Sequence, residues 1–172
     1  GLAAANTGGL DDFLQMLDAE VKPFIAAHYR VNGADQALFG HSLGGLAVVR
    51  ALMTRPAAYR TFISASPSLF WNDRAVLAGE PSLAARIRSG AVQPRVLLMA
   101  GALEGARSGY RSNGTPMTQT QVNPLIQTTR MVDNAADLGA LLEHIPGQGA
   151  YRVQTVIVSF FVRSPTPSSF TS

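Results

Sequence analysis

The chain has 172 residues, of which 47% are hydrophobic and 15% are charged, a composition typical of one globular domain with a substantial core. The net charge is only +3 and the basic residues are scattered, so we expect no nucleic-acid partner. No apolar run is long enough to predict a membrane span. Cysteine is absent, which removes disulfides and thiol chemistry and leaves both cytoplasm and periplasm open, with the cytoplasm slightly favoured.

The first periodic segment predicts an amphipathic helix over residues 10–28. Pro23 lies inside it and lacks a backbone N–H, so we expect a kink or a restart there. The rest of the chain alternates strands with helices, at the following positions: strand 34–40, helix 44–56, strand 61–66, helix 82–90, strand 95–101, helix 120–144 and strand 151–158. Near-continuous apolar strands that alternate with helices predict an α/β fold, with a mostly parallel sheet and helices on both faces.

The domain is expected to occupy residues 1–158, and residues 159–172 are expected to form a tail. The tail reads SFFVRSPTPSSFTS, and its Ser, Thr and Pro content is typical of a frayed end rather than of a packed element. No internal repeat or linker divides the rest of the chain.

The strongest functional signal is the pentapeptide Gly40-His41-Ser42-Leu43-Gly44, which joins a predicted strand to a predicted helix. A serine on such a turn is the arrangement of a nucleophile elbow, and glycines are expected on both sides because side chains there would collide with neighbouring backbone. The turn lifts the Ser42 hydroxyl above the sheet and leaves the Leu43 N–H at a helix N-terminus, where it can donate to an oxyanion. We therefore interpret Ser42 as a catalytic nucleophile and the Leu43 N–H as an oxyanion-hole donor.

Glu104 is the candidate acid, because it follows strand 95–101 at the carboxyl edge of the predicted sheet. A carboxylate at this edge could orient the imidazole of a catalytic histidine. An exposed loop glutamate explains the same position equally well. Asp133 and Asp137 lie four residues apart on a helix and are interpreted as solvated side chains.

The segment SPSLFWND after strand 61–66 is a candidate substrate-binding wall. Trp71 offers flat apolar surface for an acyl or aromatic group, although it could simply cap the core. Ser66 and Ser68 could contact substrate, and Asp73 is a weaker site candidate. No pattern of His, Cys, Asp or Glu indicates a metal site.

Four stretches together resemble the esterase branch of the α/β-hydrolase superfamily, which includes the ferric-siderophore trilactone esterases: NTGGLDDFLQMLDAEVKPFI, ALFGHSLGGLAVVRAL, SASPSLFWND and VLLMAGALEG. The resemblance runs from about residue 6 to about residue 158. It implies a serine hydrolase that cleaves small-molecule carboxylic esters through an acyl-enzyme, without metal or organic cofactor. Arg107 and Arg111, which follow Glu104, could attract an anionic substrate of the catecholate siderophore type.

The same resemblance implies that part of the domain is missing. Members of the family carry further strands upstream, including a loop that donates the second oxyanion amide, and those strands are absent here. We therefore expect an incomplete domain that exposes an apolar edge or face of its sheet and that can self-associate through this surface.

The general base is the hardest group to place. In the family, the catalytic histidine lies in a loop just after the last strand, but no histidine follows residue 158. His28 and His144 close helices that run back toward the opposite edge of the sheet. His41 precedes Ser42 on the same tight turn, so its side chain is expected to point elsewhere.

Two functions therefore remain open from the sequence. The first is an ester hydrolase whose nucleophile is Ser42 and whose histidine and upstream strands lie outside the chain. The second is a catalytically defective α/β-hydrolase-like fragment or binding module, in which the elbow is kept as architecture only.

Overall fold

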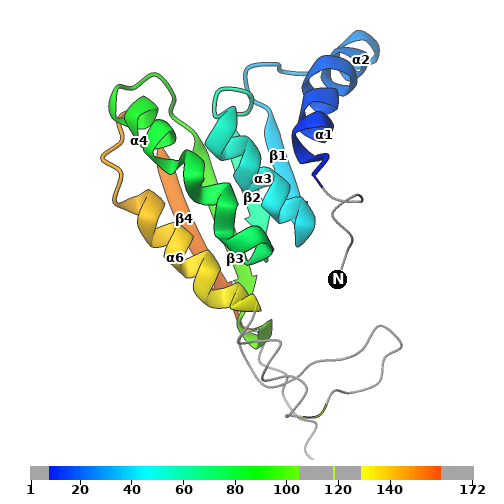
Figure 1. Ribbon diagram of the computed structural model, residues 1–172. Helices are drawn as coiled ribbons and strands as arrows, with labels where there is room; N and C mark the ends of the chain where they lie inside the picture. Colours follow the sequence, from blue (N-terminus) through cyan, green and yellow to red (C-terminus); the bar gives the residue numbers. More distant parts are fainter. Residues whose placement is uncertain (1–7, 105–117, 119–128, 160–172) are drawn as a thin grey trace, which may run out of the picture.

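The computed structural model describes residues 8–104, 118 and 129–159 (Figure 1). Its elements follow one another in this order: α1 Leu10–Met16, the π-helical turn η2 Leu17–Val21, α2 Lys22–His28, β1 Ala37–His41, α3 Leu43–Thr54, β2 Thr61–Ala65, the 3-10 helix η3 Trp71–Gly79, α4 Glu80–Arg88, β3 Arg95–Gly101, the 3-10 turn η4 Ala102–Glu104, α6 Met131–Glu143 and β4 Arg152–Val158. The tail expected over residues 159–172 lies outside the described residues apart from Ser159.

The four described strands form one parallel sheet in the order β1-β2-β3-β4, which confirms the predicted parallel α/β arrangement. In register, His41 lies beside Ala65, and Ala65 lies beside Met99. The carboxyl ends of β1, β2 and β3 therefore meet at one edge of the sheet. Ser42 comes directly after β1, and Glu104 ends the turn that follows β3, so both lie at this edge.

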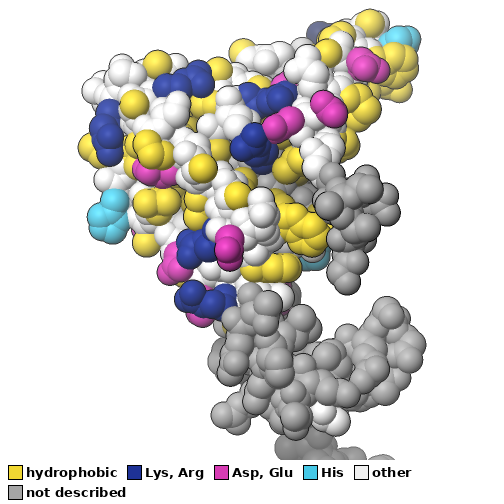
Figure 2. Space-filling model, in the orientation of Figure 1, with side chains coloured by type: hydrophobic (Ala, Val, Ile, Leu, Met, Phe, Trp, Pro, Cys, Tyr) yellow, Lys and Arg dark blue, Asp and Glu magenta, His cyan; other side chains and the backbone are white. Residues whose placement is uncertain are grey.

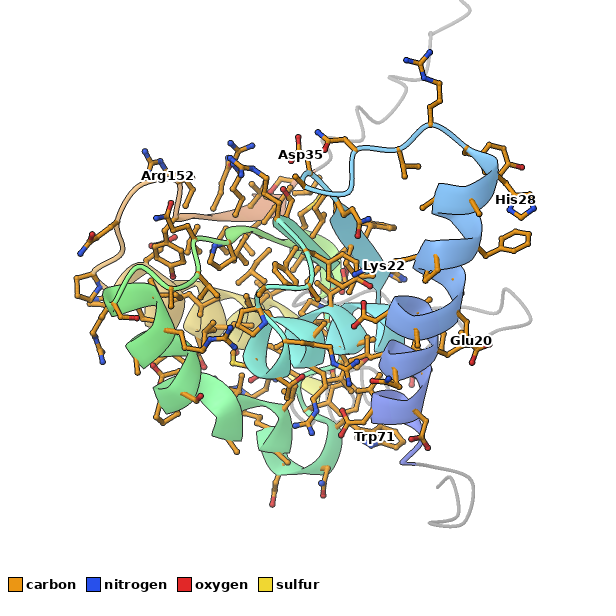
Figure 3. All side chains as sticks on the ribbon, turned by 90° about the horizontal axis from the view of Figure 1, so that it is seen from above. Glu20, Lys22, His28, Asp35, Trp71 and Arg152 are labelled. Atoms are coloured by element: carbon orange, nitrogen blue, oxygen red, sulfur yellow. The ribbon has the colours of Figure 1, made fainter. Side chains whose placement is uncertain are left out.

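The helices differ from the expectation, because in the described part α3, α4 and α6 all lie on the same face of the sheet (Figures 1 and 3). The strand order explains this arrangement. Right-handed crossovers that always step in one direction across a parallel sheet place every crossover helix on the same side. Burial alternates accordingly: Phe62 and Leu98 face the helices and are 0% exposed, whereas Phe39 on the opposite face is 65% exposed.

The core lies between the sheet and these three helices. Helix α3 is buried along most of its length, because its apolar positions pack on β1 and β2 and because α4 packs against it. Helix α6 covers β3 and β4. Among the residues that the structure describes, no helix is long and apolar enough to cross a membrane.

Residues 10–28 are helical throughout, but the type of helix changes twice. Its last part, α2, begins at Lys22 with Pro23 in its first turn, in agreement with the expected restart. The turn Leu17–Val21 is π-helical, and Lys22 donates its backbone N–H to the Leu17 carbonyl before α2 continues. The widened turn lies just before Pro23, which has no backbone N–H to donate, so the hydrogen-bond pattern of the helix changes at this point. The segment buries little apolar surface, since only Leu14 is fully inside the core.

Ion pairs attach this helical segment to α3. Asp11 receives two hydrogen bonds from Arg50, of 2.9 and 2.8 Å, and Asp18 lies 3.2 Å from Arg55. Figure 2 shows basic and acidic side chains next to one another over the line between α1 and α3. These ion pairs supplement the packing of Leu10, Leu14 and Leu17 against the core.

Candidate active site

Ser42 adopts a backbone conformation that L-residues rarely take, with φ 56° and ψ −116°. Three hydrogen bonds hold it there. Its N–H donates to the Ala65 carbonyl at 3.0 Å, and its carbonyl accepts the N–H of Leu46 at 3.0 Å and of Ser68 at 3.1 Å. A strained residue fixed by its surroundings between a strand and a helix is the geometry expected of a nucleophile elbow.

The two glycines of the pentapeptide play different parts. A Cβ at Gly40 would lie 2.1 Å from the Gly44 carbonyl oxygen, so glycine is required there, as predicted. A Cβ at Gly44 would meet nothing within 4 Å, so the expectation of a collision at this position is wrong. The next residue, Gly45, was not singled out from the sequence, yet a Cβ there would lie 2.9 Å from the Ala65 carbonyl oxygen. Gly45 therefore lets α3 approach the end of β2.

Glu104 lies beside the end of β2 rather than in an exposed loop. Its Oε1 accepts the Ser66 hydroxyl at 2.5 Å and the Gly101 N–H at 3.0 Å. These two donors fix the carboxylate at the carboxyl edge of the sheet, where the sequence placed the candidate acid.

Ser66 and Ser68 are buried, with 6% and 4% of their surface exposed. Instead of facing an open site, Ser66 contacts Glu104, and the Ser68 hydroxyl lies 3.3 Å from the Ser42 hydroxyl. The sequence placed both serines near the site but gave no sign of these partners.

Leu43 begins α3, so its N–H belongs to the first helical turn, where amides have no acceptor within the helix. Its side chain is 53% exposed and lines a cavity of about 420 Å³. Trp71 also lines this cavity and at the same time packs against the core, and its contact with a substrate stays a prediction. Leu46 and Val76 extend the apolar wall, and Asp11 and Arg50 add an ion pair.

The other carboxylates are placed as follows. Asp73 lies in a left-handed run of three residues, Asn72 to Arg74, with φ of 49°, 51° and 62°. Asp137 lies 3.4 Å from Arg74, and Asp133 lies 3.4 Å from Arg130, so both are paired at the surface instead of solely solvated. Arg107 and Arg111 lie outside the described residues.

None of the three histidines of the chain is positioned as a base for Ser42. His28 and His144 each donate Nδ1–H to a carbonyl of their own helix, at 2.7 Å to Phe24 and at 2.6 Å to Ala140. Both helices end at the edge of the sheet opposite the strand arrowheads (Figure 1), and Figure 3 shows His28 far from the sheet. His41 is exposed at the end of β1. The predicted wrong-edge placement of His28 and His144 is therefore confirmed.

Within residues 8–104, 118 and 129–159, no group of three or more His, Cys, Asp or Glu side chains could hold a metal ion. Among the described residues, this edge of the sheet carries the Ser42 hydroxyl, the Glu104 carboxylate and the first amides of α3.

Comparison with known proteins finds siderophore esterases among the relatives of this chain. The chain is 36% identical over 97 residues to the ferri-bacillibactin esterase BesA of Bacillus subtilis, covering 56% of this chain and 34% of that protein. It is 43% identical over 72 residues to the siderophore enterobactin esterase of Emericella nidulans, covering 41% of this chain and 24% of that protein. The chain therefore spans about a third or less of the length of these curated relatives.

Solved structures agree with this assignment. The siderophore hydrolase EstA from Aspergillus nidulans matches with a TM-score of 0.73 and 27% identity, over 88% of this chain and 52% of that one. The fold is thus that of about half of an α/β-hydrolase siderophore esterase. The family model described as "Putative esterase" matches residues 1–133, and with the elbow and the fold described above, the chain belongs to this esterase family.

Proposed function

We propose that the chain carries the nucleophile of a serine hydrolase that cleaves carboxylic esters through an acyl-enzyme on Ser42. The observation that carries the proposal is the strained Ser42 turn at the carboxyl edge of the sheet, with φ 56° and three backbone hydrogen bonds that hold it. Membership of the esterase family supports it. The substrate class we propose is a siderophore ester, because the relatives described above are named as siderophore esterases.

In the proposed reaction, the Ser42 hydroxyl oxygen attacks the ester carbonyl carbon while a base takes its proton. The carbonyl oxygen becomes an oxyanion that accepts the Leu43 N–H. The bond to the alcohol oxygen then breaks and the alcohol leaves with a proton from the base, after which water releases the acid from Ser42. No metal or organic cofactor takes part.

Glu104 is proposed as the acid that orients the imidazole of the base. Neighbouring parallel strands lie about 4.8 Å apart, so the ends of β1 and β3, which β2 separates, lie roughly 10 Å apart. An imidazole bridging a serine hydroxyl and a carboxylate fits such a span once the side chains reach toward each other. The cavity beside Leu43 and Trp71 is proposed to take the acyl or aromatic group of the substrate.

The missing base favours the second candidate function for the chain on its own. His28 and His144 are directed into their own helix ends, and no described histidine contacts Ser42. The alternative is a catalytically defective fragment or binding module that keeps the elbow as architecture. The two candidates differ in one measurable respect, which is whether a supplied base restores catalysis by Ser42.

Free imidazole provides that base. We expect millimolar imidazole to accelerate p-nitrophenyl acetate hydrolysis by the chain more than by Ser42→Ala, which subtracts the reaction of imidazole with the ester itself. Mass spectrometry after treatment with a fluorophosphonate should find the label on Ser42 under the same conditions. Equal rates for both proteins, together with an unlabelled Ser42, would leave the non-catalytic alternative.

A further inference from the structure

We infer that residues 66–68 are a positioning bridge, in which Ser68 holds the nucleophile Ser42 and Ser66 holds the acid Glu104. The inference rests on the proposed function for the roles of Ser42 and Glu104. It goes beyond that function because it assigns a task to two buried serines that are not part of the proposed nucleophile, base and acid. The bridge is the one described segment that is bonded to both groups.

The bonds to the nucleophile come from both sides of the Ser42 peptide. Ala65, the last residue of β2, accepts the Ser42 N–H at 3.0 Å. Three residues later, Ser68 donates its own N–H to the Ser42 carbonyl at 3.1 Å, and its hydroxyl oxygen lies 3.3 Å from that of Ser42. The turn that carries the nucleophile is thus clamped by the residues that follow β2.

The bonds to the acid start from the same short segment. The Ser66 N–H donates to the Met99 carbonyl at 2.7 Å, which ties the bridge to β3. The Ser66 hydroxyl donates to Glu104 Oε1 at 2.5 Å, and the Gly101 N–H donates to the same oxygen at 3.0 Å. A short bond to an ionised carboxylate is among the stronger hydrogen bonds of proteins and gives the carboxylate a fixed direction.

The backbone of residues 66–68 is held in a restricted conformation. Ser66 has φ 43°, a left-handed conformation that glycine would adopt more easily. Pro67 is buried and its ring restricts φ, and its Cα would lie 3.0 Å from a Cβ placed on Gly45 of α3. A serine kept in a conformation that suits glycine indicates that the hydroxyl, rather than the turn, is what this position requires.

Hydrogen exchange of the Gly101 amide shows how firmly Glu104 is held, and its measurement requires no catalytic activity. The amide donates to Glu104 Oε1, so its hydrogen exchange should quicken when the carboxylate is released. In the full 172-residue chain, we expect Ser66→Ala and Ser66→Gly to raise Gly101 exchange about tenfold or more, toward the rate in Glu104→Ala, as loss of a charged hydrogen bond predicts. Exchange at Phe62 and Leu98 in the strands should stay at the wild-type rate.

Two comparisons separate positioning from folding. Ser66→Gly removes the hydroxyl and relieves the left-handed strain. If Gly101 exchanges faster in this variant while its free energy of unfolding is no lower than that of wild type, the faster exchange comes from loss of the hydroxyl. Ser64→Ala is the matched control, because Ser64 is a buried serine two residues earlier, within β2, and its hydroxyl donates to the Gly45 carbonyl instead. The inference is overturned for Ser66 if Gly101 stays as protected as in wild type in both variants.

Ser68 is tested by the rate at which a fluorophosphonate labels Ser42 in the presence of imidazole. Ser68→Ala should slow labelling severalfold and leave Gly101 exchange unchanged, since Ser68 contacts the nucleophile and not the acid. An unchanged labelling rate would refute the role of Ser68. If Ser42 of the wild-type chain is not labelled at all, the proposed function fails, while Gly101 exchange still decides whether Ser66 fixes Glu104.

Discussion

The backbone N–H of Ser42 donates to the carbonyl of Ala65 at 3.0 Å, so the turn after β1 is bonded to the end of β2. This single bond joins the candidate nucleophile to the neighbouring strand, from which Ser66 reaches Glu104. The geometry at the edge of the sheet therefore depends on β1, β2 and β3 together. Changes to the polar side chains at this edge should therefore alter reactivity.

The 172-residue chain without added imidazole should hydrolyse p-nitrophenyl acetate at a rate close to background, and Ser42→Ala should change that rate little. Loss of one member of a Ser-His-acid set lowers kcat by several orders of magnitude, because no group then takes the serine proton. Initial rates measured by release of p-nitrophenolate test this expectation. Strong turnover that Ser42→Ala and His144→Ala both abolish would identify His144 as the base.

A longer chain should behave differently. If the family-type loop with its histidine is added after residue 158 and the upstream strands are restored, esterase activity should appear. Ser42→Ala in that longer chain should remove it. Activity that survives Ser42→Ala would place the nucleophile elsewhere.

Gly40→Ala and Gly44→Ala form a matched pair within one turn. The Cβ at position 40 would overlap the Gly44 carbonyl, and forcing an atom into packed structure costs about 1–3 kcal/mol of unfolding free energy. The Cβ at position 44 has open space in the first turn of α3, where alanine is favoured over glycine by up to about 1 kcal/mol. Urea denaturation should therefore find Gly40→Ala destabilised and Gly44→Ala unchanged or stabilised. Equal losses for both would contradict the open space at Gly44.

Alkaline pH should weaken the fold through two tyrosines. Burial raises the pKa of Tyr59 to about 12, with the Asp18 carboxylate adding to the effect, and burial raises the pKa of Tyr151 to about 12. Because the folded pKa of each tyrosine exceeds the ordinary value of 10.0, this contribution to stability is complete below pH 10.0 and is lost as the pH rises toward 12.

Absorbance of the phenolate should follow this titration. Tyr59→Phe and Tyr151→Phe should each remove one late-titrating group from the absorbance curve. Ionisation of both Tyr59 and Tyr151 near pH 10 in the wild-type chain would show that these two side chains are not buried as described.

The open face of the sheet should make the isolated chain self-associate. Phe39 is a large apolar side chain that is 65% exposed on the face opposite α3, and burying it against a second copy would remove apolar surface from water. Analytical ultracentrifugation should find a mass that rises with concentration, and Phe39→Ser should lower it. Phe24→Ser is the control, since Phe24 is 60% exposed on α2, away from the sheet. A monomer at all concentrations that unfolds cooperatively at high temperature would rule out this association.

The sequence pattern predicted much of this fold, because the hydrophobic periodicity of a strand or a helix can be read from a short stretch of residues. The strands, the turn at Ser42 and the restart at Pro23 follow from such patterns. The one-sided helices do not, since they depend on the order in which strands pair. The 3-10 helix Trp71–Gly79 has left-handed residues inside it and no periodicity that could predict it.

The candidate site divides in the same way. Ser42 and Glu104 could be found because each follows a strand. The tasks of Ser66 and Ser68 could not, because they arise from contacts between residues 38 and 26 positions apart in the chain. Likewise, the free space at Gly44 depends on the path of the backbone around it.

The strand order β1-β2-β3-β4 also bears on how the chain reaches its folded state. Each described strand pairs with the strand that comes next to it in the sequence, which keeps the sequence separation of the sheet contacts lower than other strand orders would, and low contact order favours rapid folding. The sheet can thus assemble stepwise as the polypeptide leaves the ribosome. Because the Ser42 N–H donates to the Ala65 carbonyl, the turn that carries Ser42 can reach its final geometry only after β2 has been synthesised.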